Sequence, residues 1–128
     1  NANIEVEKLP DCFGDDNLLN QLFSNIIGNA LKYSKENIQP LIHISGKHLK
    51  NKSLYCITDN GIGIPETQIA KIWNVFFRVD YKSYSGEGIG LSMVKRIVEK
   101  HKGQIWVESK EGEGTNFFIE LPNQIFSE

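Results

Sequence analysis

The chain has 128 residues, of which 40% are hydrophobic and 23% charged, with a formal net charge of -2 at pH 7. A chain of this size buries roughly two-thirds of its unfolded surface, so residues 1–128 are expected to form one domain without help from disulfides or structural metal. The charge balance argues against a nucleic-acid partner, and no apolar run approaches the roughly 20 residues needed to span a bilayer, so direct membrane contact is not expected.

Two residue types bear on the origin and redox state of the chain. Met93 is the only methionine, which leaves no initiator and predicts a fragment of a longer protein. Cys12 and Cys56 have no spacing to each other or to histidine that suits zinc, so two free thiols in a reducing cytosol are expected.

A short strand is predicted at the N-terminus. Ile4 and Val6 alternate with Glu5 and Glu7, which is typical of a half-buried strand, and Pro10 marks its end. The pattern then changes to steps of three and four residues, which predicts a long amphipathic helix from Asp16 onward. Asp15 or Asp16 is its expected cap. Its apolar positions form two neighbouring rows: Leu18, Leu22, Ile26 and Ala30, and Leu19, Phe23, Ile27 and Leu31.

Four further elements follow. Alternation over residues 41–49 and 53–59 predicts a hairpin, and Pro65 is expected to be the first residue of a short helix reaching about Trp73. Residues 79–87 lack periodicity and are expected to form a mobile loop. Residues 90–101 predict a third helix that Gly103 terminates, and residues 105–107 and 117–119 predict a closing hairpin. The order favours an α+β fold with one mixed, mostly antiparallel sheet covered on one face by about three helices.

Polar residues interrupt the long helix. Asn25, Asn29 and Tyr33 follow one another at steps of four residues, with Lys32 beside them. An asparagine carbonyl there is a possible Mg²⁺ ligand, and Lys32 could neutralise phosphate charge. A solvated helix face explains the same strip equally well.

Two glycine-rich segments suggest a ligand that approaches the backbone. Asp59 at a strand exit, followed by Gly61 and Gly63, could accept a hydrogen bond from an exocyclic amine such as that of adenine, although such a segment alone is more often a plain turn. Residues 86–90 contain three alternating glycines before a helix, which is typical of a phosphate site but weak evidence alone. It is neither a Rossmann fingerprint nor a Walker loop.

Five segments in order give a specific resemblance over essentially the whole chain. The chain resembles the ATP-binding catalytic domain of sensor histidine kinases, in the superfamily shared with DNA gyrase B, the heat-shock chaperone ATPase and the MutL proteins. The resemblance implies the Bergerat fold, a two-layer α/β sandwich. The segments are residues 25–34 (the N box), 59–63, 72–78 (the F box), 86–91 and 112–115.

The resemblance implies a role for each matched residue. Asn29 would bind the Mg²⁺ that bridges the phosphates of ATP, and Asn25 would support that site. Asp59 would bind the adenine amino group with Thr115 nearby, and Arg78, assisted by Lys82, would neutralise the γ-phosphate. The remaining nucleotide-binding residues would be Lys32, Tyr33, Gly61, Gly63, Ile64, Phe76, Gly86, Gly88, Gly90 and Leu91.

The resemblance also bears on the reaction. Hydrolysing members have a glutamate where this chain has Asn25, which cannot act as a general base. The implied reaction is therefore phosphoryl transfer to a histidine on the dimerisation and phosphoacceptor domain of its own protein, with a response-regulator receiver domain downstream. None of the three histidines, His43, His48 and His101, has the sequence context of an acceptor, so the isolated fragment should bind ATP but autophosphorylate poorly.

Two other functions stay open. An anti-sigma-factor-type serine kinase shares the fold, although the missing glutamate and the F box argue against it. A nucleotide-binding regulatory module without transfer activity is the second. The implied location is cytoplasmic, in a parent protein that a membrane anchor could hold.

Overall fold

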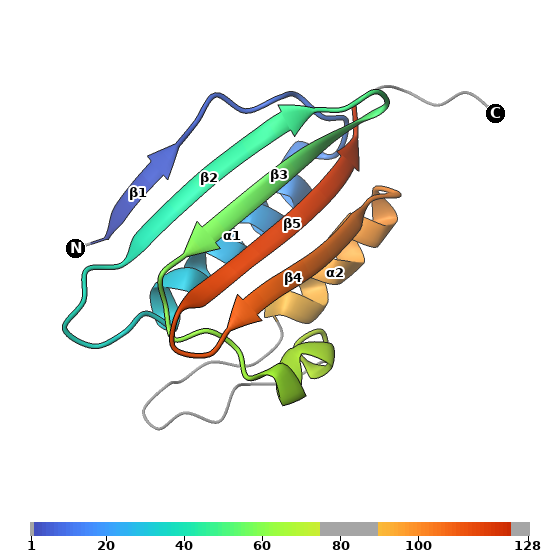
Figure 1. Cartoon of the computed structure of the whole chain (residues 1–128). Coiled ribbons are helices and arrows are strands. Elements are labelled where there is room, and N and C mark those ends of the chain that lie inside the picture. Colours follow the sequence, from blue (N-terminus) through green and yellow to red (C-terminus); the bar gives the residue numbers. More distant parts are fainter. Residues whose placement is uncertain (1, 75–89, 124–128) are drawn as a thin grey trace.

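The computed structural model describes residues 2–74 and 90–123, which form one sheet with helices on one of its faces (Figure 1). The strand order is β1-β2-β3-β5-β4; β1 runs parallel to β2, and the other neighbouring pairs are antiparallel. The predicted α+β sandwich is confirmed. In chain order the elements are β1 (Asn3–Val6), α1 (Asp16–Lys32), β2 (Leu41–His48), β3 (Lys52–Asp59), the 3-10 helix η1 (Glu66–Lys71), α2 (Gly90–Lys100), β4 (Gln104–Lys110) and β5 (Gly114–Pro122).

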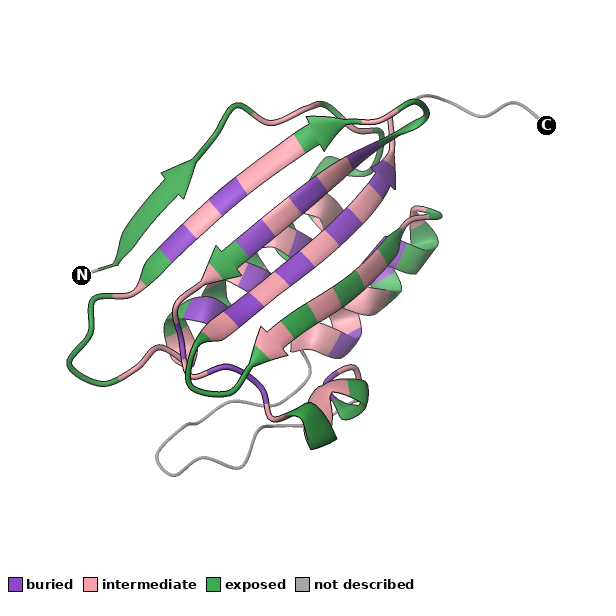
Figure 2. Cartoon of the chain, viewed as in Figure 1, coloured by how far each residue is buried: buried purple, intermediate pink, exposed green. Residues whose placement is uncertain are grey.

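The core lies between the sheet and the two α-helices. Alternate residues of β3 and β5 are buried, as expected for strands with one covered face, and the stripes are visible in Figure 2. On α1 the fully buried row is Leu22, Ile26 and Ala30, while Leu31 in the neighbouring row is exposed. One row of the helix therefore provides most of its core contact, and both predicted hairpins supply the opposite side.

Capping residues define the helix ends. Asp15 is the N-cap of α1, and its carboxylate accepts a hydrogen bond from the Leu18 N–H at 3.0 Å, which decides between the two predicted caps. The prediction that Gly103 terminates α2 is wrong in detail. Lys102 takes the left-handed conformation (φ 61°), and the Gly103 N–H donates to the Val98 carbonyl at 2.9 Å, which together close a Schellman motif.

The predicted short helix also needs correction. It is a 3-10 helix that ends at Lys71, and Pro65 precedes it as the N-cap, with an extended ψ of 139°. The Gln68 N–H donates to the Pro65 carbonyl at 2.8 Å, a bond that spans three residues as in a 3-10 turn. Pro65 therefore begins the turn without adopting helical dihedral angles.

The N-terminal strand is less buried than its alternation predicts. All four residues of β1 are exposed, including Ile4 at 45% and Val6 at 57%. β1 is an edge strand. Figure 1 shows that the helices lie behind β3, β5 and β4, which are separated from β1 by β2. The prediction of a half-buried strand is wrong because no helix covers this edge.

His43 holds β1 to the sheet through two carboxylates. Its Nε2 lies 2.6 Å from Glu7 Oε2, and its Nδ1 lies 3.4 Å from Glu5 Oε1. The hydrogen bond to Glu7, assisted by that to Glu5, raises the pKa of His43 above the ordinary value of 6.5, against a smaller opposing effect of desolvation. The residue facing His43 from β3 is the uncharged Thr58.

This arrangement predicts a pH-dependent stability. Because the folded-state pKa of His43 is raised, its contribution is complete below the unfolded pKa of 6.5 and is lost as the pH rises through the folded value. The unfolding free energy of the wild type should therefore fall, relative to His43→Gln, between about pH 6 and about pH 8. Urea denaturation of both proteins at the two pH values measures the difference. A constant difference would contradict the assignment.

No helix in the described ranges is both long and apolar enough to cross a membrane.

Candidate functional site

Asp59 ends β3 directly opposite Thr115 at the start of β5. Its Oδ1 accepts a hydrogen bond from the Gly61 N–H at 2.8 Å, and the Thr115 N–H also donates to the carboxylate. Burial raises the pKa of Asp59 above its ordinary value, and these two N–H groups offset part of that effect. The result is a half-buried carboxylate with acceptor capacity that the two backbone donors leave unused.

Glycines let the backbone around Asp59 pack more closely than a side chain would permit. Gly63 has φ +75°, and a Cβ there would lie 2.2 Å from the Lys110 carbonyl oxygen. Gly114 has φ +137°, and a Cβ there would lie 2.1 Å from the carbonyl oxygen of Asp59 itself. The Gly112 N–H donates to the Ile62 carbonyl at 2.7 Å. The loop after β3 is thereby joined to the β4–β5 turn.

Ser109 is a residue of this site that the sequence interpretation missed. Its hydroxyl accepts a hydrogen bond from the Ile64 N–H at 2.8 Å, donates to the Gly114 carbonyl at 2.8 Å and lies 2.7 Å from Thr115 Oγ1. A signal was available: Ser109 continues the inward-facing alternation of Ile105 and Val107 with a polar residue. The same hydroxyl contacts the loop, the turn and the partner strand.

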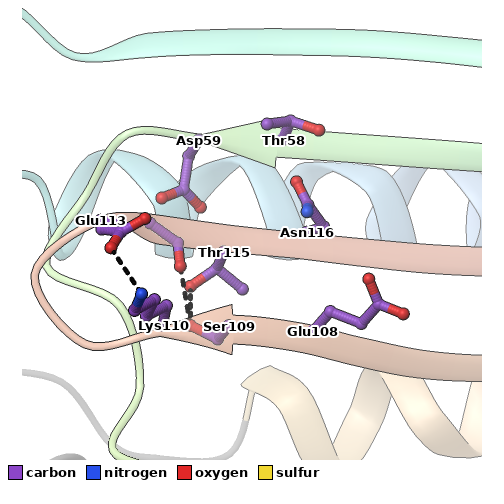
Figure 3. Close-up of a pocket in the computed structure, with 9 residues that line it drawn as sticks. Thr58, Asp59, Glu108, Ser109, Lys110, Glu113, Thr115 and Asn116 are labelled. Carbon is purple, nitrogen blue, oxygen red and sulfur yellow. Dashed lines mark hydrogen bonds and ion pairs between the residues drawn. The ribbon is translucent and has the colours of Figure 1, made fainter.

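A hollow of about 370 Å³ opens at this end of the sheet. Figure 3 shows the side chains from the ends of β3, β4 and β5 that border it. Strand alternation puts Asp59, Ser109 and Thr115 on the helix-covered face and their strand neighbours on the open face, so the lining of the hollow includes residues of both faces. Its lining comprises Thr58, Asp59, Glu108, Ser109, Lys110, Glu113, Gly114, Thr115 and Asn116.

The two α-helices are antiparallel, which decides where the asparagine strip faces. At one end, the Asp15 N–H donates to His101 Nε2 at 3.0 Å, so the start of α1 meets the end of α2. Further along, Asn25 Nδ2 lies 3.9 Å from Met93 Sδ. Asn29, one turn later, therefore lies toward the start of α2, where Gly90 and its following residues present the positive end of the helix.

The far end of α1 adjoins the first glycine segment. The Ile62 N–H donates to the Tyr33 carbonyl at 3.0 Å, and a Cβ on Gly61 would lie 2.6 Å from that same oxygen. Lys32 Nζ lies 5.4 Å from the centre of the Tyr33 ring. The end of α1 thus adjoins the loop after β3, and Asp59 at the end of β3 lies opposite Thr115 at the start of β5.

Asn29 is the residue that the sequence predicts as a metal ligand. Its side chain is half-buried, and within residues 2–74 and 90–123 its amide has no hydrogen-bond partner. Among the described residues no group of three or more His, Cys, Asp or Glu side chains is arranged to hold a metal. An Mg²⁺ ion here would therefore depend on an amide oxygen, phosphate oxygens and water, which suits its octahedral shell.

Several predicted site residues lie outside the described residues, namely Phe76, Arg78, Lys82, Gly86 and Gly88, together with the loop 79–87. The first part of the F box is described. Trp73 packs edge-on against Phe117 with ring centres 6.1 Å apart, and Lys95 Nζ of α2 lies 5.6 Å from the centre of the Trp73 ring. Trp73, just after η1, therefore packs against both α2 and the sheet.

The three histidines have structural surroundings. His101 Nδ1 bonds the Ile97 carbonyl at 2.7 Å while its Nε2 accepts from Asp15, so both ring nitrogens are occupied. His43 binds the two carboxylates of β1, and His48 ends β2 at the hairpin. Both cysteines are free.

Comparisons with known proteins agree on one family. Residues 14–125 match the family model described as "Histidine kinase-, DNA gyrase B-, and HSP90-like ATPase". The "Sensor protein kinase WalK" of Staphylococcus aureus is 41% identical over 117 residues, which are 89% of this chain and 28% of that relative.

Solved structures show the same similarity. The mycobacterial sensor histidine kinase MprB has a TM-score of 0.85 and 29% identity, with 98% of this chain and 86% of that chain covered. A catalytic domain of the histidine kinase ThkA has a TM-score of 0.76 and 28% identity, with 94% and 78% covered. The chain spans only 19% to 28% of the length of the curated relatives it matches.

Proposed function

Because the chain belongs to the histidine kinase-, DNA gyrase B- and HSP90-like ATPase family, we propose that it is the ATP-binding catalytic domain of a sensor histidine kinase. In this proposal, residues 1–128 form one domain that donates the γ-phosphoryl group of ATP to a histidine on a separate dimerisation and phosphoacceptor domain. The phosphoryl group then passes to a receiver domain of a response regulator. ATP as the donor implies that the domain works in the cytoplasm.

One observation carries the proposal. A half-buried carboxylate, Asp59, and a half-buried amide, Asn29, lie at the same end of the two layers, together with the N-terminus of α2. The carboxylate suits the amino group of adenine, and the helix N-terminus suits the negative charge of phosphates. In this arrangement the base of ATP would lie at the end of β3, and its phosphates would extend toward the start of α2.

Each described residue has a distinct part in the proposed reaction. Asp59 and Thr115 hold the base, and Asn29 would provide an oxygen ligand for Mg²⁺. Bound Mg²⁺ would neutralise charge on the β- and γ-phosphates. Lys32 and Tyr33 would lie along the phosphates and ribose. The remaining proposed nucleotide contacts are Gly61, Gly63, Ile64, Gly90 and Leu91, and, outside the described residues, Phe76, Arg78, Gly86 and Gly88.

We favour transfer over hydrolysis because Asn25, one turn before Asn29 on α1, carries an amide instead of a carboxylate. Asn25 contacts Met93 of α2, and an amide cannot take a proton from water. In the transfer step an imidazole nitrogen of the acceptor forms a bond to the γ-phosphorus while the bond to the β–γ bridging oxygen breaks and ADP leaves. Positioning and charge neutralisation provide most of the rate enhancement in such reactions.

The proposal is tested by mixing this domain with a separately produced helical domain that carries the acceptor histidine. With ATP and Mg²⁺, we expect an acid-labile, base-stable phosphate on the acceptor, and no product when its histidine is replaced by glutamine. An acid-stable phosphate would instead indicate a serine kinase. ATP binding without transfer to any acceptor would favour the regulatory module.

Asn29→Asp is expected to impair transfer more than binding. The new carboxylate changes the oxygen ligand offered to Mg²⁺, so the transfer rate should fall about 100-fold while the affinity for ATP in the presence of Mg²⁺ changes by less than about threefold. Isothermal titration with and without Mg²⁺, followed by the transfer assay, separates the two effects. Asn17→Asp, at an exposed position of the same helix, is the control. Equal losses in binding and transfer would exclude a metal-specific role.

A further inference from the structure

The hydroxyl of Ser109 has a complete set of hydrogen-bond partners, and these partners determine where its proton lies. The Ile64 N–H donates to Ser109 Oγ at 2.8 Å, the Gly114 carbonyl oxygen is 2.8 Å away, and Thr115 Oγ1 is 2.7 Å away. A serine hydroxyl has one proton and two lone pairs. A carbonyl oxygen can only accept, so the proton of Ser109 is donated to Gly114.

The orientation of the Thr115 hydroxyl follows from this assignment. Ser109 Oγ has one lone pair occupied by the Ile64 N–H and one remaining. The contact of 2.7 Å with Thr115 is then a hydrogen bond only if Thr115 donates its proton to Ser109. Thr115 Oγ1 thereby keeps only lone pairs for other partners. It is buried and borders the same hollow as the carboxylate of Asp59.

We propose that Ser109 is a positioning residue for base specificity: it holds Thr115 Oγ1 as an acceptor beside Asp59, which selects a purine with a 6-amino group over a purine with a 6-oxo group. This inference rests on the proposed function, since it assumes that Asp59 binds the base. Two adjacent acceptors favour the two N–H donors of a 6-amino group. They oppose a 6-oxo group, because its oxygen would face lone pairs without a proton between them.

Ser109→Ala should weaken the preference for a 6-amino purine over a 6-oxo purine. Without its acceptor, the Thr115 hydroxyl can rotate and donate its proton into the site, so an oxygen at purine position 6 becomes tolerable. The probes are ATP and ITP, whose bases differ at position 6 and at the adjoining N1 proton. We expect the ratio of the two affinities, measured by titration, to narrow about tenfold in Ser109→Ala relative to the wild type.

Ser53→Ala is the matched control for a purely structural serine. Its hydroxyl is fully buried and donates to the Asp11 carbonyl at 2.7 Å, away from the site. This variant should lose stability and keep the wild-type ATP to ITP ratio. If Ser109→Ala behaves in the same way, with both affinities reduced equally, Ser109 only holds the loop and the proposal is overturned.

A second variant tests the proposal in case Ser109→Ala does not fold. Thr115→Val removes the acceptor while keeping the side-chain shape, so its ATP to ITP ratio must also narrow, and an unchanged ratio overturns the proposal. In the double variant the two effects should not add, since they act on one hydroxyl. Failure of the wild type to bind ATP would be a different result, because it would refute the proposed function itself.

Discussion

Replacing Asp59 with asparagine is expected to reduce ATP affinity by about 10²–10³-fold at pH 7. The carboxylate can only accept hydrogen bonds, whereas the asparagine side chain brings an NH₂ group into a position where the adenine amino group must also donate. Gly61 and Thr115 direct their N–H groups at this carboxylate and would hold the remaining amide oxygen, so the NH₂ group would face the ligand.

Asp59→Asn should lose ATP affinity without a loss of unfolding free energy. Burial raises the folded-state pKa of Asp59 above its unfolded value of 3.8, so the ionised carboxylate lowers the unfolding free energy at neutral pH. That free energy should rise as the pH falls through the raised pKa, and ATP affinity should fall over the same interval. Titration calorimetry and urea denaturation of Asp59→Asn, with exposed Asp11→Asn as control, measure both quantities. Unchanged ATP affinity would refute the adenine assignment.

Local patterns in the sequence were sufficient to predict most of the fold. The periods of α1 and α2, the cap at Asp15 and the two hairpins depend on interactions between near neighbours, which a sequence displays directly. The 3-10 geometry after Pro65 is a local feature that was missed, whereas two other features depend on distant residues. β1 is exposed because no helix extends over it, and Gly103 lacks a side chain because the Glu120 carbonyl of β5 would lie 2.2 Å from its Cβ.

The same division applies to the site. Asp59, Asn29 and the glycines were recognisable because their types and order resemble a family. Ser109 was missed because its importance arises only from the β4–β5 register, which brings it opposite Thr115, and from the loop that returns to it at Ile64. The antiparallel packing of α1 and α2, which directs Asn29 toward the start of α2, is likewise a tertiary property.

Gly114→Ala is expected to lower the unfolding free energy by about 3–5 kcal/mol and to abolish ATP binding. Its φ of +137° is unfavourable for any residue with a Cβ, and that Cβ would lie 2.1 Å from the carbonyl oxygen and 3.1 Å from the carbonyl carbon of Asp59. Neither atom can move without shifting the end of β3. Because the shift displaces the carboxylate proposed to bind adenine, stability and affinity should fall together, unlike in Asp59→Asn.

Gly112→Ala distinguishes the two causes of the stability loss in Gly114→Ala, which are the strained φ and the close contact with the Asp59 carbonyl. Gly112 lies in the same turn with φ +86°, but a Cβ there would have no neighbour within 4 Å in the part of the chain that the structure describes, so only the backbone strain of about 1 kcal/mol remains. Denaturation curves and ATP titrations of both variants provide the comparison. A cost for Gly114→Ala no greater than that for Gly112→Ala would show that β3 and the β4–β5 turn can separate freely. In that case the close contact between the turn and Asp59 could not be what holds the carboxylate in place.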